Sequence, residues 1–372
     1  MPLTTVITES RLNNMQPNPV YMEGPVCPVP LRHQTHIVMG HGSGGRMTQE
    51  LIAKVFVPYF SNPALLEGND FASLLLPEEI TQGGHLAVST DSHIVAPLFF
   101  PGGDIGKLAV CGTVNDVAMS GARPLGLTAG FILEEGFPIE TLQKVVSSMA
   151  DAARESGVPI VAGDTKVVEK GKADGLFINT AGFGWVPASR TIGGQYAQAG
   201  DAVIISGTMG DHGIAVLTAR GELGFEAALD SDVAPLNHLI EAVLQEIPQV
   251  HVLRDPTRGG LATTLNEIAV QSHVNITIEE TAVPIKPVVQ SACEMLGFDP
   301  LYVANEGKVI LILPEQFAEK ALSILQKQKY GQDAVVIGKV LESPKDRVLL
   351  KNRIGSTRIL DVLAGEMLPR IC

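Results

Sequence analysis

The stretch IGKLAVCGTVNDVAMS at residues 105–120 is apolar around most of its circumference, which predicts a mostly buried helix. One acidic residue, Asp116, interrupts this apolar run. A buried carboxylate is costly unless it is paired or binds a metal ion, so Asp116 is a candidate for chemistry. The segments at 86–95 and 125–133 predict a strand on either side of the helix along the chain.

The same mixture of helices and strands continues to residue 340. Residues 187–200 contain Pro, Ser and three glycines and predict a boundary, so we expect domains at 35–190 and 200–360. Residues 1–34 are polar and proline-rich, which predicts a disordered leader, and residues 361–372 lack a clear period and predict a flexible tail. Two mixed domains indicate an α+β protein. Further helices are predicted at 47–60, 138–156, 213–220, 235–247, 259–271 and 287–296, and further strands at 158–162, 176–183, 202–206, 274–278, 309–313 and 335–340.

Composition excludes several classes of function. The net charge of −13 argues against nucleic acid as a partner, because clustered Lys and Arg bind phosphate backbones. The four cysteines are far apart, so neither a zinc site nor a disulfide framework is predicted, and a reducing cytoplasm fits best. The N-terminus lacks the apolar core of a signal peptide, and no apolar run is long enough to span a membrane. We therefore expect a cytoplasmic protein without a membrane partner.

A glycine-rich loop, Gly40–Gly45, is predicted between a strand and a helix. Backbone amides in such a turn, with the positive end of the next helix, make an anion cradle. The loop formally matches a dinucleotide fingerprint, but residues 61–70 are not strand-like where the second strand should follow. It is no Walker A loop, because Lys is absent, and Ser43 lacks the frame of a hydrolase nucleophile. A plain tight turn remains an alternative.

Five aspartates stand beside small residues, and two of them follow predicted strands. Strand ends are where ligands gather in such sheets, and Mg²⁺ binds one or two carboxylates together with phosphate oxygens. Scattered aspartates around a nucleotide therefore form a reasonable site. The alternative is that each residue only caps a helix or a turn. The five are Asp70, Asp91, Asp116, Asp164 and Asp255, with Asp91 and Asp164 at the strand ends.

Three other residues are candidates for catalysis. Lys166 follows Asp164 by two residues and suits contact with a phosphate or a reacting group. Glu306, in Asn-Glu-Gly-Lys before a strand, suits a general base. Cys372 is the last residue of the sequence, and an exposed thiol is reactive as its thiolate. For each, an ordinary surface or turn residue remains the alternative.

Together these motifs resemble the HypE family of hydrogenase maturation proteins, the carbamoyl dehydratases. That family belongs to the superfamily of aminoimidazole ribonucleotide synthetase, thiamine monophosphate kinase and selenophosphate synthetase. The resemblance spans residues 40–372 and leaves the leader without a role. The matching motifs are His-Gly-Ser-Gly-Gly at 41–45, Ser-Thr-Asp at 89–91, Gly-Thr-Val-Asn-Asp at 112–116, Gly-Asp-Thr-Lys-Val-Val at 163–168, Gly-Asp-His-Gly at 210–213, Arg-Asp-Pro-Thr-Arg-Gly-Gly at 254–260, Glu-Gly at 306–307 and Pro-Arg-Ile-Cys at 369–372.

The resemblance implies two α+β domains and a homodimer whose N-terminal domains join their sheets into a β-barrel. It implies that ATP and Mg²⁺ bind between the domains, next to the dimer interface. Cys372, Lys166 and Glu306 would be catalytic. The implied metal ligands are Asp70, Asp91, Asp116 and Asp255, and the implied nucleotide-binding residues are Gly42, Ser43, Gly44, Gly45, Thr113, Asn115, Gly163 and Asp164.

It also implies a reaction sequence. A HypF-type carbamoyltransferase would load a carbamoyl group onto the Cys372 sulfur, and the tail would swing into the ATP site. There Glu306, oriented by Lys166, would help to remove the nitrogen protons while ATP takes the oxygen. The resulting thiocyanate would pass to a HypC–HypD complex as the cyanide ligand of [NiFe]-hydrogenase.

Three rival functions remain open from the sequence. A small-molecule kinase or synthetase of the same superfamily would not need Cys372. A non-catalytic scaffold would only present that thiol to other maturation proteins. A nicotinamide oxidoreductase rests on the weak glycine fingerprint alone and is the least favoured.

Overall fold

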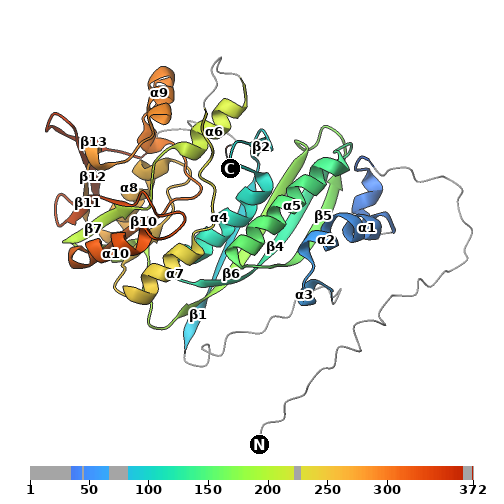
Figure 1. Ribbon diagram of the computed structural model, residues 1–372, viewed down its shortest axis with the longest axis horizontal. Coiled ribbons are helices and arrows are strands. Elements are labelled where there is room, and N and C mark those ends of the chain that lie inside the picture. The colour runs from blue at the N-terminus through green and yellow to red at the C-terminus, as the bar shows by residue number, and fades with distance from the viewer. Residues whose placement is uncertain (1–34, 44–45, 67–82, 222–227, 363–370, 372) are drawn as a thin grey trace, which may run out of the picture. The chain divides into compact units, whose positions relative to one another are not determined.

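Two β-sheets, each covered by helices, organise the chain (Figure 1). The computed structural model describes residues 35–43, 46–66, 83–221, 228–362 and 371. None of the helices in these ranges combines the length and apolar character needed to cross a bilayer.

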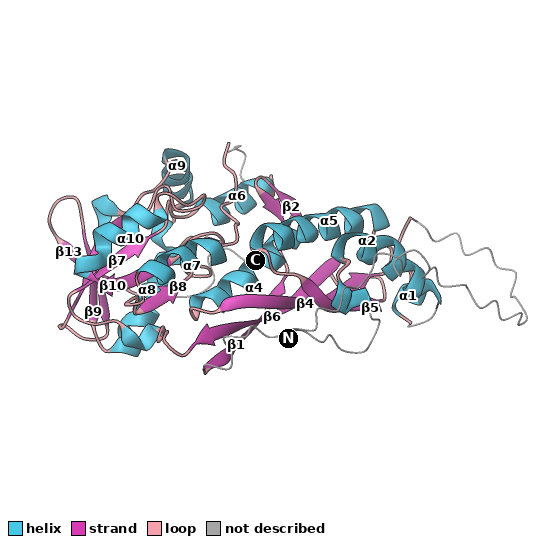
Figure 2. Cartoon of the chain, turned by 60° about the horizontal axis from the view of Figure 1, so that its bottom comes forward, coloured by secondary structure: helices cyan, strands magenta, loops and turns pink. Residues whose placement is uncertain are grey.

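The N-terminal sheet has the strand order β1-β6-β4-β5. Strands β4 and β5 are parallel, and the other two pairings are antiparallel. Figure 2 shows helices α4 and α5 together on one face of this sheet. The bounds are β1 Gly84–His93, α4 Ile105–Met119, β4 Arg123–Glu134, α5 Ile139–Ser156, β5 Ile160–Val168 and β6 Leu176–Pro187, with a short hairpin of β2 Phe99–Phe100 and β3 Gly103–Asp104.

The two faces of this sheet differ sharply. Along β4, alternate residues from Leu127 to Leu133 are buried beneath the helices, as a strand with one covered face requires. The opposite face leaves large apolar side chains in contact with solvent, among them Leu86, Val88 and Ile132. The sheet is open, and no closed barrel occurs among the described strands. The predicted barrel would need a second copy.

The predicted helix at 47–60 is broken into three pieces. Helix α1 covers Arg46–Leu51, a π-helical turn covers Ile52–Phe56, and α2 covers Val57–Phe60; the short α3, Pro63–Leu66, follows. The amide of Val57 bonds the Ile52 carbonyl, one residue beyond α-helical spacing, immediately before Pro58. Proline has no amide hydrogen to continue an α-helical ladder, which explains the break.

The C-terminal sheet has the order β13-β12-β9-β11-β7-β10-β8. Its inner strand β7, Asp201–Ile205, lies between β11 and β10 and is buried on both faces, so residues 202–205 form a continuous apolar run rather than an alternating one. Val203 and Ile205 pack with α8, and Ala202 and Ile204 pack with α7 and α10. The remaining bounds are α6 Asp211–Ala219, α7 Asn237–Glu246, β8 Val252–Arg254, α8 Gly260–Ser272, β9 Asn275–Glu279, α9 Pro287–Leu296, β10 Ile310–Pro314, α10 Ala318–Leu325, β11 Val335–Leu341, β12 Arg347–Lys351 and β13 Thr357–Leu360.

Strand β5 corrects one expectation. It runs on to Val168, paired with Glu134 of β4, instead of ending near Ala162. Asp164 and Lys166 therefore lie within a strand and not after one. The Gly-Asp-Thr sequence looks like a turn, but the parallel pairing to β4 holds it extended. Strands β8, β12 and β13 and helix α10 were not predicted.

Candidate active site

Four carboxylates from both halves of the chain form an electrostatic cluster. Asp91 comes from β1, Asp116 from α4, Asp255 follows β8, and Glu306 precedes β10. Each of the last three feels the charge of other members of the group. We call these four residues the acidic cluster. Asp91, Asp116 and Asp255 are distant in sequence but close enough in the folded chain for their charges to interact, and their role as metal ligands stays a prediction.

Strand β1 and helix α4 position the first two members. The Ser89 hydroxyl donates a hydrogen bond to Oδ2 of Asp116 over 2.8 Å. Nε2 of His93 lies 3.6 Å from Oδ2 of Asp91. A Cβ atom at Gly112 would lie 3.3 Å from Cε1 of His93, so the glycine lets α4 approach the strand closely at this histidine. The Ser-Thr-Asp and Gly-Thr-Val-Asn-Asp motifs are thus one structural unit.

The Glu306 loop is held by its neighbours in sequence and by Asp232. Oδ1 of Asp232 accepts a hydrogen bond from the Glu306 amide over 3.0 Å. The Asn305 side chain accepts from the Gly210 amide and donates to the Pro256 carbonyl, joining three loops. At Gly307, a Cβ atom would lie 1.8 Å from the Asp232 carbonyl oxygen, so no other residue fits. The Asn-Glu-Gly motif therefore fixes the position of one carboxylate.

Asn115 joins the two halves of the site. Its side chain is buried, accepts from the Leu236 amide over 2.8 Å and donates to the carbonyls of Ala234 and Glu306. Thr113, one helical turn away from Asp116, is also buried and shares a hydrogen bond with Thr180. Both were predicted to bind nucleotide. These buried contacts favour a positioning role, and direct contact with nucleotide stays a prediction.

Burial and mutual repulsion raise the pKa values of Asp116, Asp255 and Glu306. Desolvation raises the pKa of Asp116, partly offset by the Ser89 hydrogen bond. Desolvation, with the neighbouring Asp116 charge, raises the pKa of Asp255 to about 7. Burial, followed by the charge of Asp255, raises the pKa of Glu306 well above its ordinary value. Such a cluster binds protons or cations more readily than separate carboxylates do.

The donor set suits Mg²⁺ shared with phosphate oxygens. Oε1 of Glu306 is buried and accepts no hydrogen bond from any described residue, whereas Oδ2 of the buried Asp232 forms an ion pair with Nζ of Lys308 at 3.6 Å. Within the described ranges, no three acidic, His or Cys side chains converge to hold a metal ion by themselves. That arrangement fits an ion that takes one or two carboxylates and completes its shell with phosphate and water. Asp70, the fourth predicted ligand, lies outside the described residues.

Lys166 lies elsewhere. Asp91, Thr180, Ala129 and Gly163 share one register row, so Asp91 faces α4, whereas the next residue in each strand faces the opposite side. Asp164 and Lys166 are on that open face, on β5, three strands from β1. Three strand spacings are about 14 Å. Within one chain, the register therefore separates Lys166 from Asp91, and a role of Lys166 in orienting Glu306 stays a prediction.

Lys166 instead pairs with Asp164. Its Nζ lies 2.9 Å from Oδ1 and 2.8 Å from Oδ2 of Asp164, and both side chains are about two-thirds exposed, at 64% and 68%. The hydrogen bond from Lys166 lowers the pKa of Asp164. This ion pair marks the rim of a cavity.

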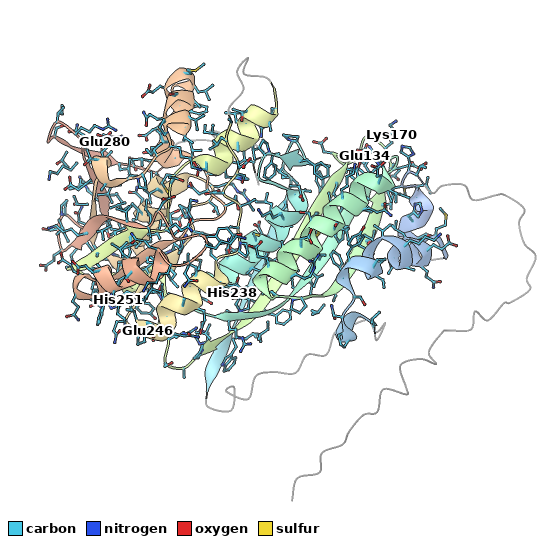
Figure 3. All side chains as sticks on the ribbon, in the orientation of Figure 1. Glu134, Lys170, His238, Glu246, His251 and Glu280 are labelled. Carbon is cyan, nitrogen blue, oxygen red and sulfur yellow. The ribbon has the colours of Figure 1, made fainter. Side chains whose placement is uncertain are left out.

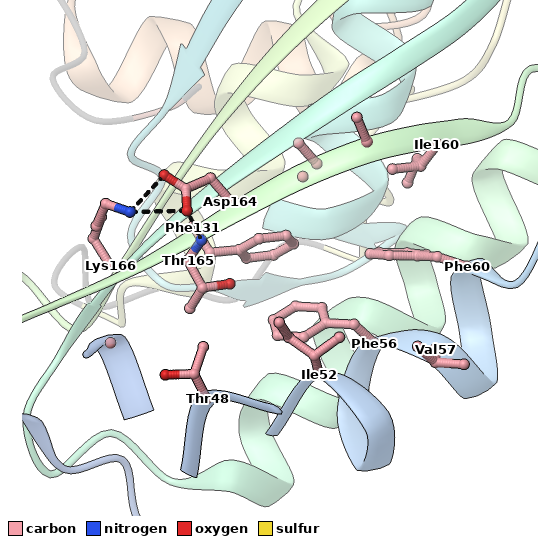
Figure 4. Close-up of a pocket in the computed structure, with 14 residues that line it drawn as sticks. Thr48, Ile52, Phe56, Val57, Phe60, Phe131, Ile160, Asp164, Thr165 and Lys166 are labelled. Carbon is pink, nitrogen blue, oxygen red and sulfur yellow. Dashed lines mark hydrogen bonds and ion pairs between the residues drawn. The ribbon is translucent and has the colours of Figure 1, made fainter. Parts of the chain in front are cut away.

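The cavity has a volume of about 310 Å³ and lies at the β5 edge of the N-terminal sheet. Figure 4 shows its apolar end formed by Phe56, Phe60 and Phe131, with the Asp164–Lys166 pair at the other end. Gly42 and Gly163, both predicted to bind nucleotide, also line it. A flat aromatic ring with a polar edge matches these walls.

The glycine-rich loop differs from the predicted strand–turn–helix. Only a single bridge, His36 to Pro138, precedes it, and Met39–Gly42 form a 3₁₀ turn. A Cβ atom at Gly42 would lie 2.6 Å from the Val167 amide nitrogen, so this glycine lets the turn rest on β5. Ser43 bonds the Gly40 carbonyl. Gly44 and Gly45 lie outside the described residues.

The end of the chain returns to this part of the molecule. Ile371 is only 4% exposed and belongs to the apolar cluster that contains Val303 and Ala304, beside the Glu306 loop. Nε2 of His212 lies 2.7 Å from the Ile371 carbonyl oxygen. Cys372 itself lies outside the described residues.

Three of these residues escaped the sequence prediction. Asp232 stands in a segment without period, so no local pattern marks it. Ser89 was quoted only as part of a motif, although its hydroxyl holds Asp116. His212 was quoted only within Gly-Asp-His-Gly, and no local pattern predicts its contact, because its partner is 159 residues away in the chain.

Known proteins resemble this chain along most of its length. Residues 68–186 match the family described as AIR synthase related protein, N-terminal domain, and residues 198–351 match the corresponding C-terminal domain. The carbamoyl dehydratase HypE of Cupriavidus necator is 53% identical over 336 residues, covering 90% of this chain and 95% of that protein.

Solved structures agree with the sequence matches. A crystal structure of the hydrogenase maturation protein HypE in complex with ATP gives a TM-score of 0.86 at 51% identity, covering 90% of this chain and 99% of the other. HypE in a HypE–HypF complex gives 0.73 at 50% identity, covering 86% and 100%. The similarity includes both sheets.

Proposed function

Because the chain belongs to the HypE family of carbamoyl dehydratases, with the two-domain fold of AIR synthase related proteins, we propose that it dehydrates a carbamoyl group carried on its own Cys372. The product is a thiocyanate, the source of the cyanide ligand in [NiFe]-hydrogenase maturation. One observation carries the proposal. The residue before the cysteine, Ile371, is buried, and its carbonyl oxygen lies 2.7 Å from Nε2 of His212. The other nitrogen of His212 contacts Ser231, whose chain neighbour Asp232 accepts the hydrogen bond from the Glu306 amide.

ATP and Mg²⁺ are the cofactors in this proposal. One or two of Asp91, Asp116 and Asp255 would hold the metal together with the phosphates, and Asp70 is a further predicted ligand. The bound ion supplies positive charge to phosphate oxygens. The cavity beside Asp164 has the chemistry to take the nucleotide base, with aromatic walls and a polar rim.

The chemistry balances as the removal of one water. The carbamoyl oxygen attacks the γ-phosphoryl group of ATP, and the bond to ADP breaks. The oxygen then leaves with phosphate as its carbon–oxygen bond breaks, the nitrogen loses its two protons, and a carbon–nitrogen triple bond forms. Glu306 takes one of those protons, because its raised pKa and its unpaired Oε1 among the described residues suit a general base, and the other leaves with the departing phosphate.

We assign Lys166 to a site shared between two copies. Register pairs Leu86 with Trp185 and Val88 with Phe183 on the open face, giving an apolar surface that nothing described in this chain covers. A second copy on this face closes the two sheets into a barrel and buries that surface. The same contact places Lys166 at the interface, where it serves the acidic cluster of the other copy.

A HypF-type carbamoyltransferase loads Cys372, and a HypC–HypD complex accepts the product. A HypE in complex with HypF supports the first partnership. The alternatives that use no covalent chemistry on Cys372 predict no change in its mass.

Intact mass spectrometry with HypF, carbamoyl phosphate and ATP tests the proposal. The C-terminal peptide should gain one carbamoyl group and then lose one water, only when ATP is present. Glu306→Gln should stop at the carbamoylated state, and Cys372→Ala should show neither change while still binding ATP. A mass that never changes on Cys372 would favour a scaffold. Full activity after deletion of residues 369–372 would favour a small-molecule kinase.

A further inference from the structure

We propose that His212 is a positioning residue that holds the end of the chain by the backbone carbonyl of Ile371, and so fixes the point from which Cys372 enters the site. The proposal rests on the proposed function for its purpose, but its geometry and its test do not. His212 stands in the Gly-Asp-His-Gly motif at 210–213, at the start of α6, and no chemistry described above uses it.

The imidazole is the middle of a hydrogen-bond chain. The Val233 amide donates to the Ser231 hydroxyl oxygen over 3.1 Å. That hydroxyl lies 2.8 Å from Nδ1 of His212, and Nε2 of His212 lies 2.7 Å from the Ile371 carbonyl oxygen. One side chain, that of His212 at the start of α6, thus joins the loop at Ser231 to the end of the chain.

Donors and acceptors in this chain have one consistent assignment. A carbonyl oxygen only accepts, so Nε2 of His212 carries the proton. Ser231 already accepts from the Val233 amide and donates its own proton to Nδ1. The imidazole is then neutral, and both of its nitrogens have hydrogen-bond partners. Complete burial lowers the pKa of His212, which also favours the neutral form.

Other groups around His212 keep the contact dry and fixed. The ring of Phe100, from the short β2 strand, meets the imidazole edge-on with centroids 5.5 Å apart. Ile371 shares its apolar cluster with Val289 of α9 and with Ala304, two residues before Glu306. Among the described residues, the charged group that acts on the pKa of His212 is Asp232, which also accepts the hydrogen bond from the Glu306 amide. The latch and the Glu306 loop thus share a support.

The contact has a direct consequence for Cys372. The Ile371 carbonyl carbon is bonded to the Cys372 nitrogen, so holding that carbonyl sets where the last residue begins. Recognition through the backbone carbonyl and the apolar side chain of Ile371 makes no demand on the thiol. The one described hydrogen bond, from His212, is worth about 1 kcal/mol, a size that permits release to meet other proteins.

A broad-specificity carboxypeptidase measures the contact directly. To remove Cys372, the protease must attack the same Ile371 carbonyl that His212 holds. The rate therefore follows the population in which this carbonyl is free. The experiment uses the full chain under reducing conditions, without nucleotide, and follows the loss of one cysteine residue by intact mass.

His212→Ala should release Cys372 about tenfold faster, the factor expected for loss of one buried hydrogen bond. Ser231→Ala, which removes only the outer partner, should give a smaller increase. His238→Ala is the matched control, since the exposed His238 also contacts a backbone carbonyl, that of Glu155 (Figure 3). It should release Cys372 at the wild-type rate.

An unchanged release rate in folded His212→Ala protein would overturn the proposal. If that variant does not fold, His212→Gln, which keeps a donor, and Ser231→Ala decide the question. No increase with Ser231→Ala would then reject the latch. A purely structural role predicts a lower melting temperature and no selective gain in cleavage. A confirmed latch in a protein that never forms thiocyanate would reject only the proposed function.

Discussion

The acidic cluster and the Asp164–Lys166 pair carry the same kinds of charge in opposite settings. In the cluster, Asp116, Asp255 and Glu306 are covered by both halves of the chain, and burial raises their pKa values. In the pair, each charge has its partner within 2.9 Å and most of its surface in solvent. One region is crowded with unbalanced negative charge, and the other is balanced and open.

The difference shows what each region lacks. Like charges in a poorly solvated place are costly, so the cluster is completed by a cation or by protons. The exposed pair is already neutral as a unit and contributes little to stability by itself. What it lacks is a protein surface that would exclude water from it. We therefore assign the cluster to a role within the chain and the pair to a role across an interface between copies.

The largest expected effect comes from removing one residue of each region. Lys166→Ala and Glu306→Gln should each slow dehydration by about 10²-fold or more, because proton transfer and charge stabilisation have that size. When the two inactive variants are mixed and allowed to exchange subunits, activity should return. Half of the dimers are then mixed, each with one of two sites intact, so recovery should approach about a quarter of wild type.

The mixing experiment separates two arrangements by single-turnover thiocyanate formation. A mixture as inactive as its components would place Lys166 and Glu306 in the same site of one chain, against the shared assignment. Mixing each variant with itself controls for refolding during exchange.

A charge on the open face should break the pairing of copies. Val88 is 68% exposed on that face, and Val88→Asp should weaken self-association about a hundredfold, since a dimer would have to bury an unpaired carboxylate. Analytical ultracentrifugation gives the dissociation constant. Val270→Asp, on the exposed side of α8, is the matched control and should leave association unchanged. Equal behaviour of the two variants would remove this face as the interface.

The pH dependence of the melting temperature should distinguish the two regions by a smaller effect. Glu306 keeps its proton to higher pH in the folded chain than in the unfolded one, so folded stability falls as pH rises through that window. Glu306→Gln removes this loss, and its melting temperature without metal or nucleotide should exceed wild type by roughly 2–4 °C at pH 8, with a smaller gain at pH 5.5. Glu246→Gln, an exposed carboxylate labelled in Figure 3, should show no such trend. A constant difference across pH would contradict the raised pKa.

The smallest effect is expected at the exposed pair. Lys166→Gln should change the free energy of unfolding of the isolated chain by no more than about 0.5 kcal/mol, as for other solvent-exposed pairs. Lys144→Gln, which breaks an exposed pair with Glu140, is its control and should behave alike. Chemical denaturation of a monomeric background such as Val88→Asp measures both. A large loss at Lys166 alone would show that the pair already stabilises one chain.

Local patterns predicted much of the fold. The apolar helix at 105–119, the strands around it and helix α9 follow from periodicity and from their bounding glycines and prolines. The short strands β8, β12 and β13 at the two ends of the sheet were missed, because a few residues carry little period. Strand β8 pairs with β10, β12 pairs with β9, and β13 pairs with β12. The bounds of β5 were wrong because its pairing with β4, not its composition, decides them.

The features of the candidate site likewise divide into those that the sequence predicts and those that depend on the folded chain. By itself the sequence determined which residue types were available for chemistry and their order along the chain: the aspartates beside small residues, Asn-Glu-Gly, Asp-Thr-Lys and a final cysteine. Only the tertiary structure decided which of them meet. Asn115 and Asp232 bring Glu306 to the aspartates, the alternation of β5 turns Lys166 to the other face, and His212 receives Ile371 across 159 residues. Burial, register and long-range hydrogen bonds depend on the whole packed chain, and no local stretch encodes them.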